Sequence, residues 1–178
     1  AVLLKNEDGI LPITGRERRV ALIGAFAAQP RYQGAGSSRI VPTLMDTAVQ
    51  ALPLCGMNVT GFAKGFEKNG RANEKLAAEA VELAKKADVA LLYLGLDDPG
   101  EAEGEDRADM LLPENQLALL KAVAAVNKNV VVVLSCGCAV EMQGHRYAKA
   151  VIHGYLGGQA GAMAMARLLT GQANPSGK

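Results

Sequence analysis

The chain has 178 residues, 49% of them hydrophobic, with 19 basic and 18 acidic residues and a formal net charge of +1. This length is enough for one well-buried α/β domain and too little for two large independent ones. The evenly scattered charge gives no footprint for nucleic acid or for an anionic membrane, so neither is expected as a partner. The longest apolar runs are strand-length, short of the roughly 20 residues that a membrane-spanning helix needs.

Strand-length apolar runs alternate with helical patterns along the chain, after an N-terminal strand and loop at residues 3–12. The predicted strands lie at 19–26, within 57–63, and at 89–96, 129–134 and 150–155, and the predicted helices at 42–52, 74–87, 113–126 and 158–170. Such alternation indicates βαβ units. The predicted fold class is therefore α/β: a mostly parallel sheet with helices on both faces, an α/β sandwich with flavodoxin-like layering.

An acidic segment at residues 97–109 follows one of the most apolar predicted strands. Ligands of open α/β sheets gather at the carboxyl ends of the strands, so this loop is the first site candidate. Gly100 and Gly104 permit close backbone approach, and Glu101 and Glu103 can turn toward a cleft. A solvated charged crossover is the simpler alternative. A calcium site is the third, although the spacing does not match the twelve-residue helix–loop–helix pattern.

A second loop candidate, rich in glycine and hydroxyl groups, occupies residues 32–39 after the first strong predicted strand. Its composition suits a bound phosphate, hydrogen bonds to a sugar, or simple turn formation. Neither the dinucleotide fingerprint nor a P-loop lysine is present, which disfavours a nucleotide cofactor. Residues 157–161 predict a tight strand-to-helix turn.

The cysteines and histidines form no catalytic or metal-binding pattern. Cys55, Cys136 and Cys138 are odd in number, and a Cys-x-Cys pair at the end of an apolar strand favours buried thiols over a zinc site. His145 and His153 have no neighbouring nucleophile motif and are interpreted as structural or peripheral. No metal and no cofactor is expected.

Five short motifs follow one another in a specific order. They are Val-Leu-Leu-Lys-Asn-Glu (2–7), Tyr-Gln-Gly-Ala-Gly-Ser-Ser-Arg (32–39), Glu-Ala-Glu-Gly-Glu-Asp-Arg (101–107), Leu-Pro-Glu-Asn-Gln (112–116) and Asn-Pro-Ser-Gly-Lys (174–178). Together they resemble the second domain of the family 3 glycoside hydrolases, the β-glucosidase and β-xylosidase group. The resemblance implies an α/β sandwich that packs against an N-terminal (β/α)8-type barrel, with the active site between them. Residues 1–178 are then one domain of a longer chain, since such a barrel needs about 250 residues of its own.

The resemblance also implies roles for particular residues. The barrel supplies an aspartate nucleophile, and this domain supplies the acid/base glutamate, which the motif places at Glu103 with Glu101 as the fallback. The substrate-binding candidates are Gln33, Ser37, Ser38 and Arg39, and the loop-structuring candidates are Asp106 and Arg107, with Arg107 clamping Asp106. Crowding among Glu101, Glu103 and Glu105 is expected to raise the pKa of the acid, as protonation of a leaving oxygen requires.

Two functions outside this class stay open from the sequence: a non-catalytic carbohydrate-binding or interaction module of the same fold, and a nucleotide-binding flavodoxin-like protein. Glu103 favours the hydrolase over the first, because a binding module needs no proton donor. The missing fingerprint disfavours the second. We also expect the face that carries residues 32–39 and 97–112 to be unusually apolar or mobile, because the barrel normally covers it.

Overall fold

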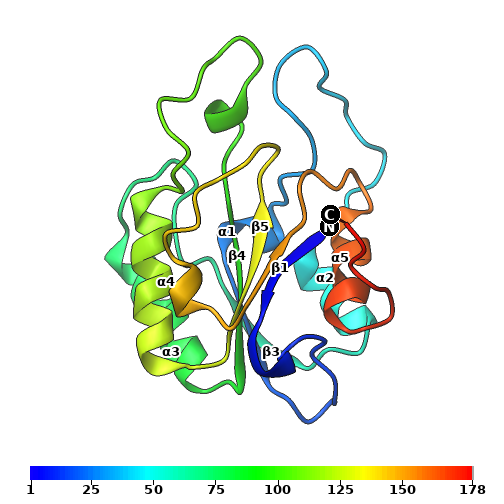
Figure 1. Cartoon of the computed structure of the whole chain (residues 1–178), viewed down its shortest axis with the longest axis vertical. Helices are drawn as coiled ribbons and strands as arrows, with labels where there is room; N and C mark the ends of the chain where they lie inside the picture. Colours follow the sequence, from blue (N-terminus) through cyan, green and yellow to red (C-terminus); the bar gives the residue numbers. More distant parts are fainter. Residues whose placement is uncertain (178) are drawn as a thin grey trace.

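The computed structural model describes residues 1–177 and contains one six-stranded sheet with helices on both faces (Figure 1). The strands are β1 (Val2–Asn6), β2 (Val20–Ile23), β3 (Val59–Ala63), β4 (Val89–Gly95), β5 (Val130–Ser135) and β6 (Ala150–His153). Their order across the sheet is β1-β6-β5-β4-β2-β3. The predicted α/β class and the layering of helices on both faces are confirmed.

The sheet is parallel except at one edge, where β1 pairs antiparallel with β6. The central strands β4 and β5 are buried over nearly their whole length, which explains the continuous apolar runs in their sequences. β1 is only partly buried, as an edge strand with one side open to solvent should be. The sequence indicates this strand but not its place in the sheet.

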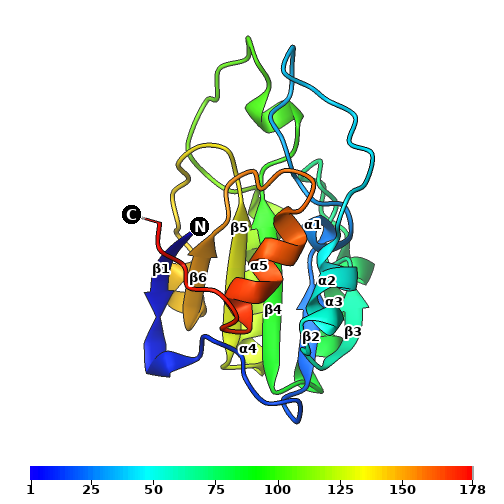
Figure 2. The same ribbon diagram turned by 90° about the vertical axis from the view of Figure 1, so that its right-hand side faces the viewer.

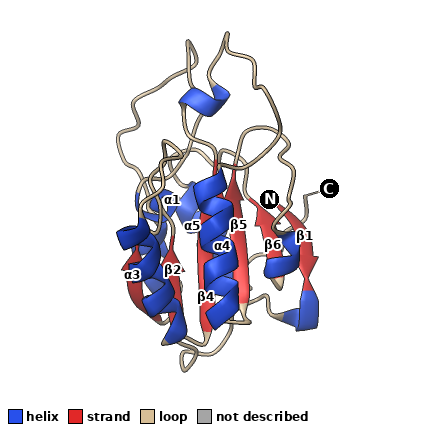
Figure 3. Cartoon of the chain, turned by 90° about the vertical axis from the view of Figure 1, so that its left-hand side faces the viewer, coloured by secondary structure: helices blue, strands red, loops and turns tan. Residues whose placement is uncertain are grey.

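The helices form two layers. They are α1 (Ala25–Ala28), α2 (Ala48–Leu54), α3 (Glu74–Lys85), α4 (Glu114–Val126) and α5 (Gly161–Leu169), with single 3-10 turns at Glu7–Gly9, Pro99–Glu101 and His145–Tyr147. α3 packs against α4 on one face of the sheet and α2 against α5 on the other, as Figures 2 and 3 show from opposite sides. Among residues 1–177, none of these helices has both the length and the apolar character to cross a bilayer.

The helix predicted at 42–52 is wrong at its start. Residues 42–47 are irregular, and α2 begins at Ala48 because the Thr47 side chain accepts the Gln50 N–H and caps the helix there. Just before the cap, the Asp46 N–H donates to the carbonyl of Gln159 at 3.0 Å, which holds this segment against the turn that leads into α5. A local cap and a tertiary contact together therefore fix where the helix begins.

Two long connections leave the carboxyl ends of neighbouring strands. β2 and β4 are neighbours, and the chain runs from β2 to β3 on one side and from β4 to β5 on the other, which makes the gap between their ends the topological switch point where open α/β sheets bind ligands. Residues 29–47 follow β2 and α1, and residues 96–113 follow β4; both rise above the sheet in Figures 1 and 2. Gly24 directly follows β2 and has φ +119, and a Cβ there would overlap the Tyr93 carbonyl oxygen.

Candidate active site

The two raised loops meet at Glu103. Ala35 and Ala102 form an isolated parallel bridge, and the Glu103 N–H donates to the Ala35 carbonyl at 3.2 Å. The Glu103 carboxylate accepts the Ser37 N–H at 2.6 Å and a short hydrogen bond from the Ser37 hydroxyl. Ser37, one of the predicted substrate-binding residues, therefore holds the exposed carboxylate of Glu103, the first acid candidate.

The environment of Glu103 lowers its pKa. The hydrogen bond from the Ser37 hydroxyl contributes most, and the Ser37 backbone N–H adds to it, because both favour the charged carboxylate. The expected rise of this pKa through crowding with Glu101 and Glu105 is therefore wrong for this chain. Glu101 turns away from Glu103 and into the protein, and Glu105 is exposed.

Glu101 occupies a pocket of hydrogen-bond donors. Its side chain is 8% exposed and forms an ion pair with Arg31 Nη1 at 3.2 Å. The backbone N–H groups of Gly137 and Cys138 each donate to it at 2.9 Å, and the Cys138 thiol lies 2.8 Å from Oε1. Both oxygens of Glu101 are thus engaged inside the protein, which suits an anchor better than a proton donor to an external substrate.

Arg31 is the main functional residue that sequence reasoning missed. Its side chain is 3% exposed, it pairs with Asp98 at 3.0 Å as well as with Glu101, and it donates to the carbonyls of Leu96 and Asp97. It also donates to the Gln33 carbonyl. Arg31 therefore ties the loop after β2 to the loop after β4. The only available signal was its place immediately before the motif at residues 32–39.

Arg107 fixes the far end of the acidic loop but not in the predicted way. Its Nη1 lies 2.7 Å from the Cys138 sulfur and donates to the Ala139 carbonyl at 3.1 Å. The predicted clamp on Asp106 is wrong, because the guanidinium reaches across to the segment after β5 instead of folding back on its own neighbour. In the described chain the exposed Asp106 has no ion pair with it.

The four predicted substrate-binding residues have different environments. Gln33 closes its own loop by bonding the Tyr32 hydroxyl and both backbone groups of Ile40, and Ser37 is bound to Glu103. Gln33 and Arg39 also line an open depression of about 390 Å³ beside the switch point. Its other polar lining residues include Lys68, Asp97 and Asp98, and its aromatic ones are Phe26 and Tyr32. Ser38 is exposed and outside this lining.

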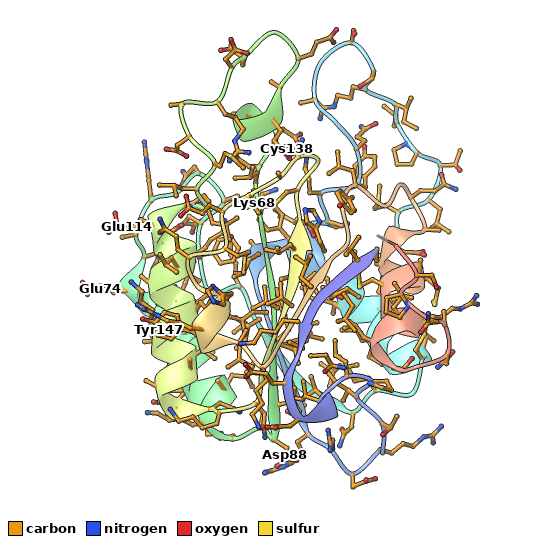
Figure 4. The ribbon with its side chains drawn as sticks, in the orientation of Figure 1. Lys68, Glu74, Asp88, Glu114, Cys138 and Tyr147 are labelled. Atoms are coloured by element: carbon orange, nitrogen blue, oxygen red, sulfur yellow. The ribbon has the colours of Figure 1, made fainter. Side chains whose placement is uncertain are left out.

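The cysteines and histidines have structural environments. Cys136 is buried, as predicted, but the prediction of a buried thiol is wrong for Cys138, which is exposed at the loop end of the sheet (Figure 4). His153 is buried and stacks on Tyr155 at 3.9 Å, while His145 is exposed and bonds the Met142 carbonyl. Within residues 1–177, no cluster of three or more His, Cys, Asp or Glu side chains is arranged to hold a metal ion.

The loops carry exposed apolar side chains around this site. Ile40, Val41 and Leu44 on one loop, Met110 and Leu111 on the other, and Tyr155 after β6 are all between 38% and 93% exposed. The same face holds the depression and Glu103. Six of the ten exposed large hydrophobic side chains among the described residues thus lie at this end of the sheet, which supports the expectation of an apolar face, and such side chains around polar groups are typical of an interaction or ligand site.

Replacing Gly36 with alanine is expected to separate Ser37 from Glu103. Gly36 has φ +105, and a Cβ there would overlap the Cβ of Glu103 and lie 2.7 Å from its Oε2. With the Ser37 hydrogen bonds lost, the pKa of Glu103 should rise toward the ordinary value for a glutamate, which carboxyl-carbon NMR measures. Gly34→Ala is the matched control, because its Cβ would meet only the Ser38 hydroxyl, at 3.7 Å. An unchanged Glu103 pKa in Gly36→Ala contradicts this account.

Comparison with known proteins identifies the relatives of the chain. A family model described as "Glycosyl hydrolase family 3 C-terminal domain" matches residues 1–178. Thermostable beta-glucosidase B of Acetivibrio thermocellus is 46% identical over 180 residues, which cover 99% of this chain and 24% of that protein. An exo-alpha-(1->6)-L-arabinopyranosidase of Bifidobacterium longum is 44% identical over 187 residues, 99% of this chain and 25% of that protein. The chain thus spans about a quarter of the length of these relatives.

Solved structures agree with the sequence relatives. The Bifidobacterium adolescentis GH3 beta-glucosidase superposes with a TM-score of 0.91 at 47% identity, over 97% of this chain and 25% of that one. The beta-glucosidase from Listeria innocua, in complex with isofagomine, superposes with a TM-score of 0.88 at 25% identity, over 98% of this chain and 24% of that one.

Proposed function

The chain belongs to the family of glycosyl hydrolase family 3 C-terminal domains, and from that premise we propose that it supplies the acid/base carboxylate and part of the sugar-binding cleft of a retaining β-glycosidase. Glu103 is the acid/base group. The substrates are β-glucosides or related glycosides. The nucleophile comes from an N-terminal (β/α)8-type barrel in the same polypeptide.

The observation that carries this proposal is the position of Glu103. It lies on an exposed loop at the carboxyl ends of the parallel strands, where the two switch-point loops touch and where ligands of this architecture bind. Of the two candidate glutamates in the motif, Glu103 is exposed and Glu101 is enclosed by protein donors. A carboxyl group must be open to the substrate to pass it a proton, so the geometry favours Glu103.

The chemistry requires two carboxyl groups. One protonates the departing glycosidic oxygen, and the second, about 5–5.5 Å away, attacks the anomeric carbon to form a covalent glycosyl-enzyme. The first carboxylate then takes a proton from water as water attacks this intermediate. In the chain by itself the pKa of Glu103 is lowered. Burial beneath a partner domain, next to the charge of the nucleophile, would raise it into the range of an acid.

The loop face supports the proposed partner domain. The exposed apolar side chains of residues 40, 41, 44, 110, 111 and 155 lie on the connections at the same end of the sheet as Glu103 and would be buried by a domain that covers this end. The depression lined by Gln33 and Arg39 would then become part of a closed cleft, in which amide, guanidinium and carboxylate groups hydrogen-bond sugar hydroxyls and Tyr32 offers an aromatic surface.

Chemical rescue by azide tests the role of Glu103 directly. In the complete polypeptide carrying Glu103→Gln, an activated aryl β-glucoside still forms the glycosyl-enzyme, but no base remains to activate water. Azide needs no base, so it should speed turnover and give the β-glucosyl azide, with the configuration retained. Chromatography of the products measures this. Glu105→Gln, a neighbouring exposed glutamate, is the control and should show no rescue. A Glu103→Gln enzyme that azide leaves unchanged contradicts the proposal.

A further inference from the structure

The loop that carries Glu103 is hydrogen-bonded at both ends to the same short segment, residues 137–139 after β5. At its start, Glu101 accepts the backbone N–H groups of Gly137 and Cys138. At its end, Arg107 binds the Cys138 sulfur and the Ala139 carbonyl. Residues 101–107 therefore form an arc over the end of β5, with Glu103 near its middle. We use the name acid arc for residues 101–107.

The Cys138 side chain contacts both Glu101 and Arg107. Its sulfur lies 2.8 Å from Glu101 Oε1 and 2.7 Å from Arg107 Nη1, so one side chain contacts both ends of the acid arc. Figure 4 places Cys138 above the sheet, beneath the acidic loop. On the other side Glu101 pairs with Arg31, which also holds the Leu96 and Asp97 carbonyls at the exit of β4.

Between these ends the acid arc has little support of its own. Gly104 has φ +82, and a Cβ added there would meet nothing within 4 Å. Residues 103–106 are all exposed. The remaining ties of Glu103 are its contacts with Ala35 and Ser37. Where Glu103 lies relative to a substrate is therefore set by the two ends of the acid arc together with the contacts to Ala35 and Ser37.

We propose that Glu101 is a positioning residue, which, with Arg31 and Cys138, holds the acid arc so that the Glu103 carboxyl group meets the glycosidic oxygen. This inference rests on the acid/base role proposed for Glu103. Proton transfer requires a heavy-atom distance of about 2.6–3.2 Å, and a misplacement of about 1 Å can cost on the order of 10²-fold in rate. Glu101 acts through Glu103 and touches no reacting atom.

A double-mutant cycle in the complete polypeptide tests the proposal. Glu101→Gln keeps an acceptor for the N–H groups of Gly137 and Cys138 but loses the charge that pairs with Arg31. We expect kcat for an alkyl or sugar glycoside to fall by roughly 10–10²-fold with little change in KM, and kcat/KM for an activated aryl glycoside, which reports only formation of the glycosyl-enzyme, to fall less. In the Glu103→Gln background the same substitution should change kcat by less than about 3-fold, because the group that it positions is gone.

The outcomes separate the inference from the function on which it rests. If Glu101→Gln lowers kcat by the same factor with and without Glu103, Glu101 does not act through Glu103 and the inference is overturned. If the loss of activity in Glu103→Gln does not depend on the leaving group, the acid/base proposal is wrong, and the positioning role of Glu101 is contradicted with it. Glu105→Gln is the matched control in the same arc and should leave both substrates unaffected.

A gentler pair of variants covers the case in which Glu101→Gln does not fold, since it leaves a buried arginine partly unpaired. Cys138→Ala removes only the sulfur contacts to the two ends of the acid arc. Cys138→Ser restores a hydrogen-bonding group at nearly the same place. We expect a loss of about 3–10-fold in kcat for the alanine variant and recovery in the serine variant. Equal activity of both Cys138 variants and the wild type contradicts the proposal.

Discussion

Glu103→Gln in the complete polypeptide should lower kcat/KM by about 10²–10⁴-fold when the leaving group is an alkyl alcohol or a sugar, and far less when it is an activated phenol. Glutamine keeps the size and most of the hydrogen-bonding reach of glutamate, so the change removes the proton and little else. An alkoxide is a poor leaving group and must be protonated as the bond breaks, whereas an acidic phenol leaves without help. The range corresponds to about 2.7–5.5 kcal/mol of transition-state stabilisation.

The measurement is kcat/KM for a series of β-glucosides whose leaving groups span a wide range of pKa, for the wild type and each variant. Glu105→Gln should follow the wild type across the series. If Glu103→Gln slows every substrate equally while only Glu101→Gln shows leaving-group dependence, the role belongs to Glu101. If neither shows it, the acidic loop is structural and the proton donor lies elsewhere.

The strands were predictable from sequence where burial alone determines the pattern of hydrophobic residues. β4 and β5 are enclosed on both faces, so their sequences are continuously apolar and their bounds nearly match the prediction. The start of α2 was not predictable, because Thr47 and a hydrogen bond from Asp46 to the distant Gln159 fix it. The antiparallel pairing of β1 with β6 likewise joins the two ends of the sequence, and no local pattern encodes it.

The location of the site was predictable from the sequence, but the hydrogen bonds and ion pairs within it were not. The acidic motif and the strand before it place Glu101 and Glu103 at the sheet edge, yet two residues of the same type at adjacent odd positions cannot be told apart by pattern. Their difference is burial, which depends on Arg31 and on the N–H groups after β5. Cys138 was expected to be a core thiol, and its exposure follows from its place two residues beyond the buried Cys136, where the chain leaves the sheet.

The isolated 178-residue chain should fold and yet hydrolyse no aryl β-glucoside above the uncatalysed rate. It has its own core: the central strands β4 and β5 are buried between two helical layers. Folding should appear as a cooperative thermal transition in circular dichroism. The hydrolysis assay uses an activated phenol as leaving group, because such a substrate needs no proton from Glu103 and so reports the nucleophile alone.

The absence of turnover follows from the chemistry of two carboxyl groups. A retaining enzyme needs a nucleophile about 5–5.5 Å from the acid, and the proposal assigns that nucleophile to the barrel. Without it the covalent intermediate cannot form, so even an activated substrate gains none of the 10⁶-fold or greater acceleration that is typical of enzymes. Adding the barrel domain as a separate protein should restore turnover if it docks on the apolar loop face around Glu103. Turnover by the rigorously purified chain that Glu103→Gln abolishes would mean that both catalytic groups lie within these residues, and the two-domain account would fail.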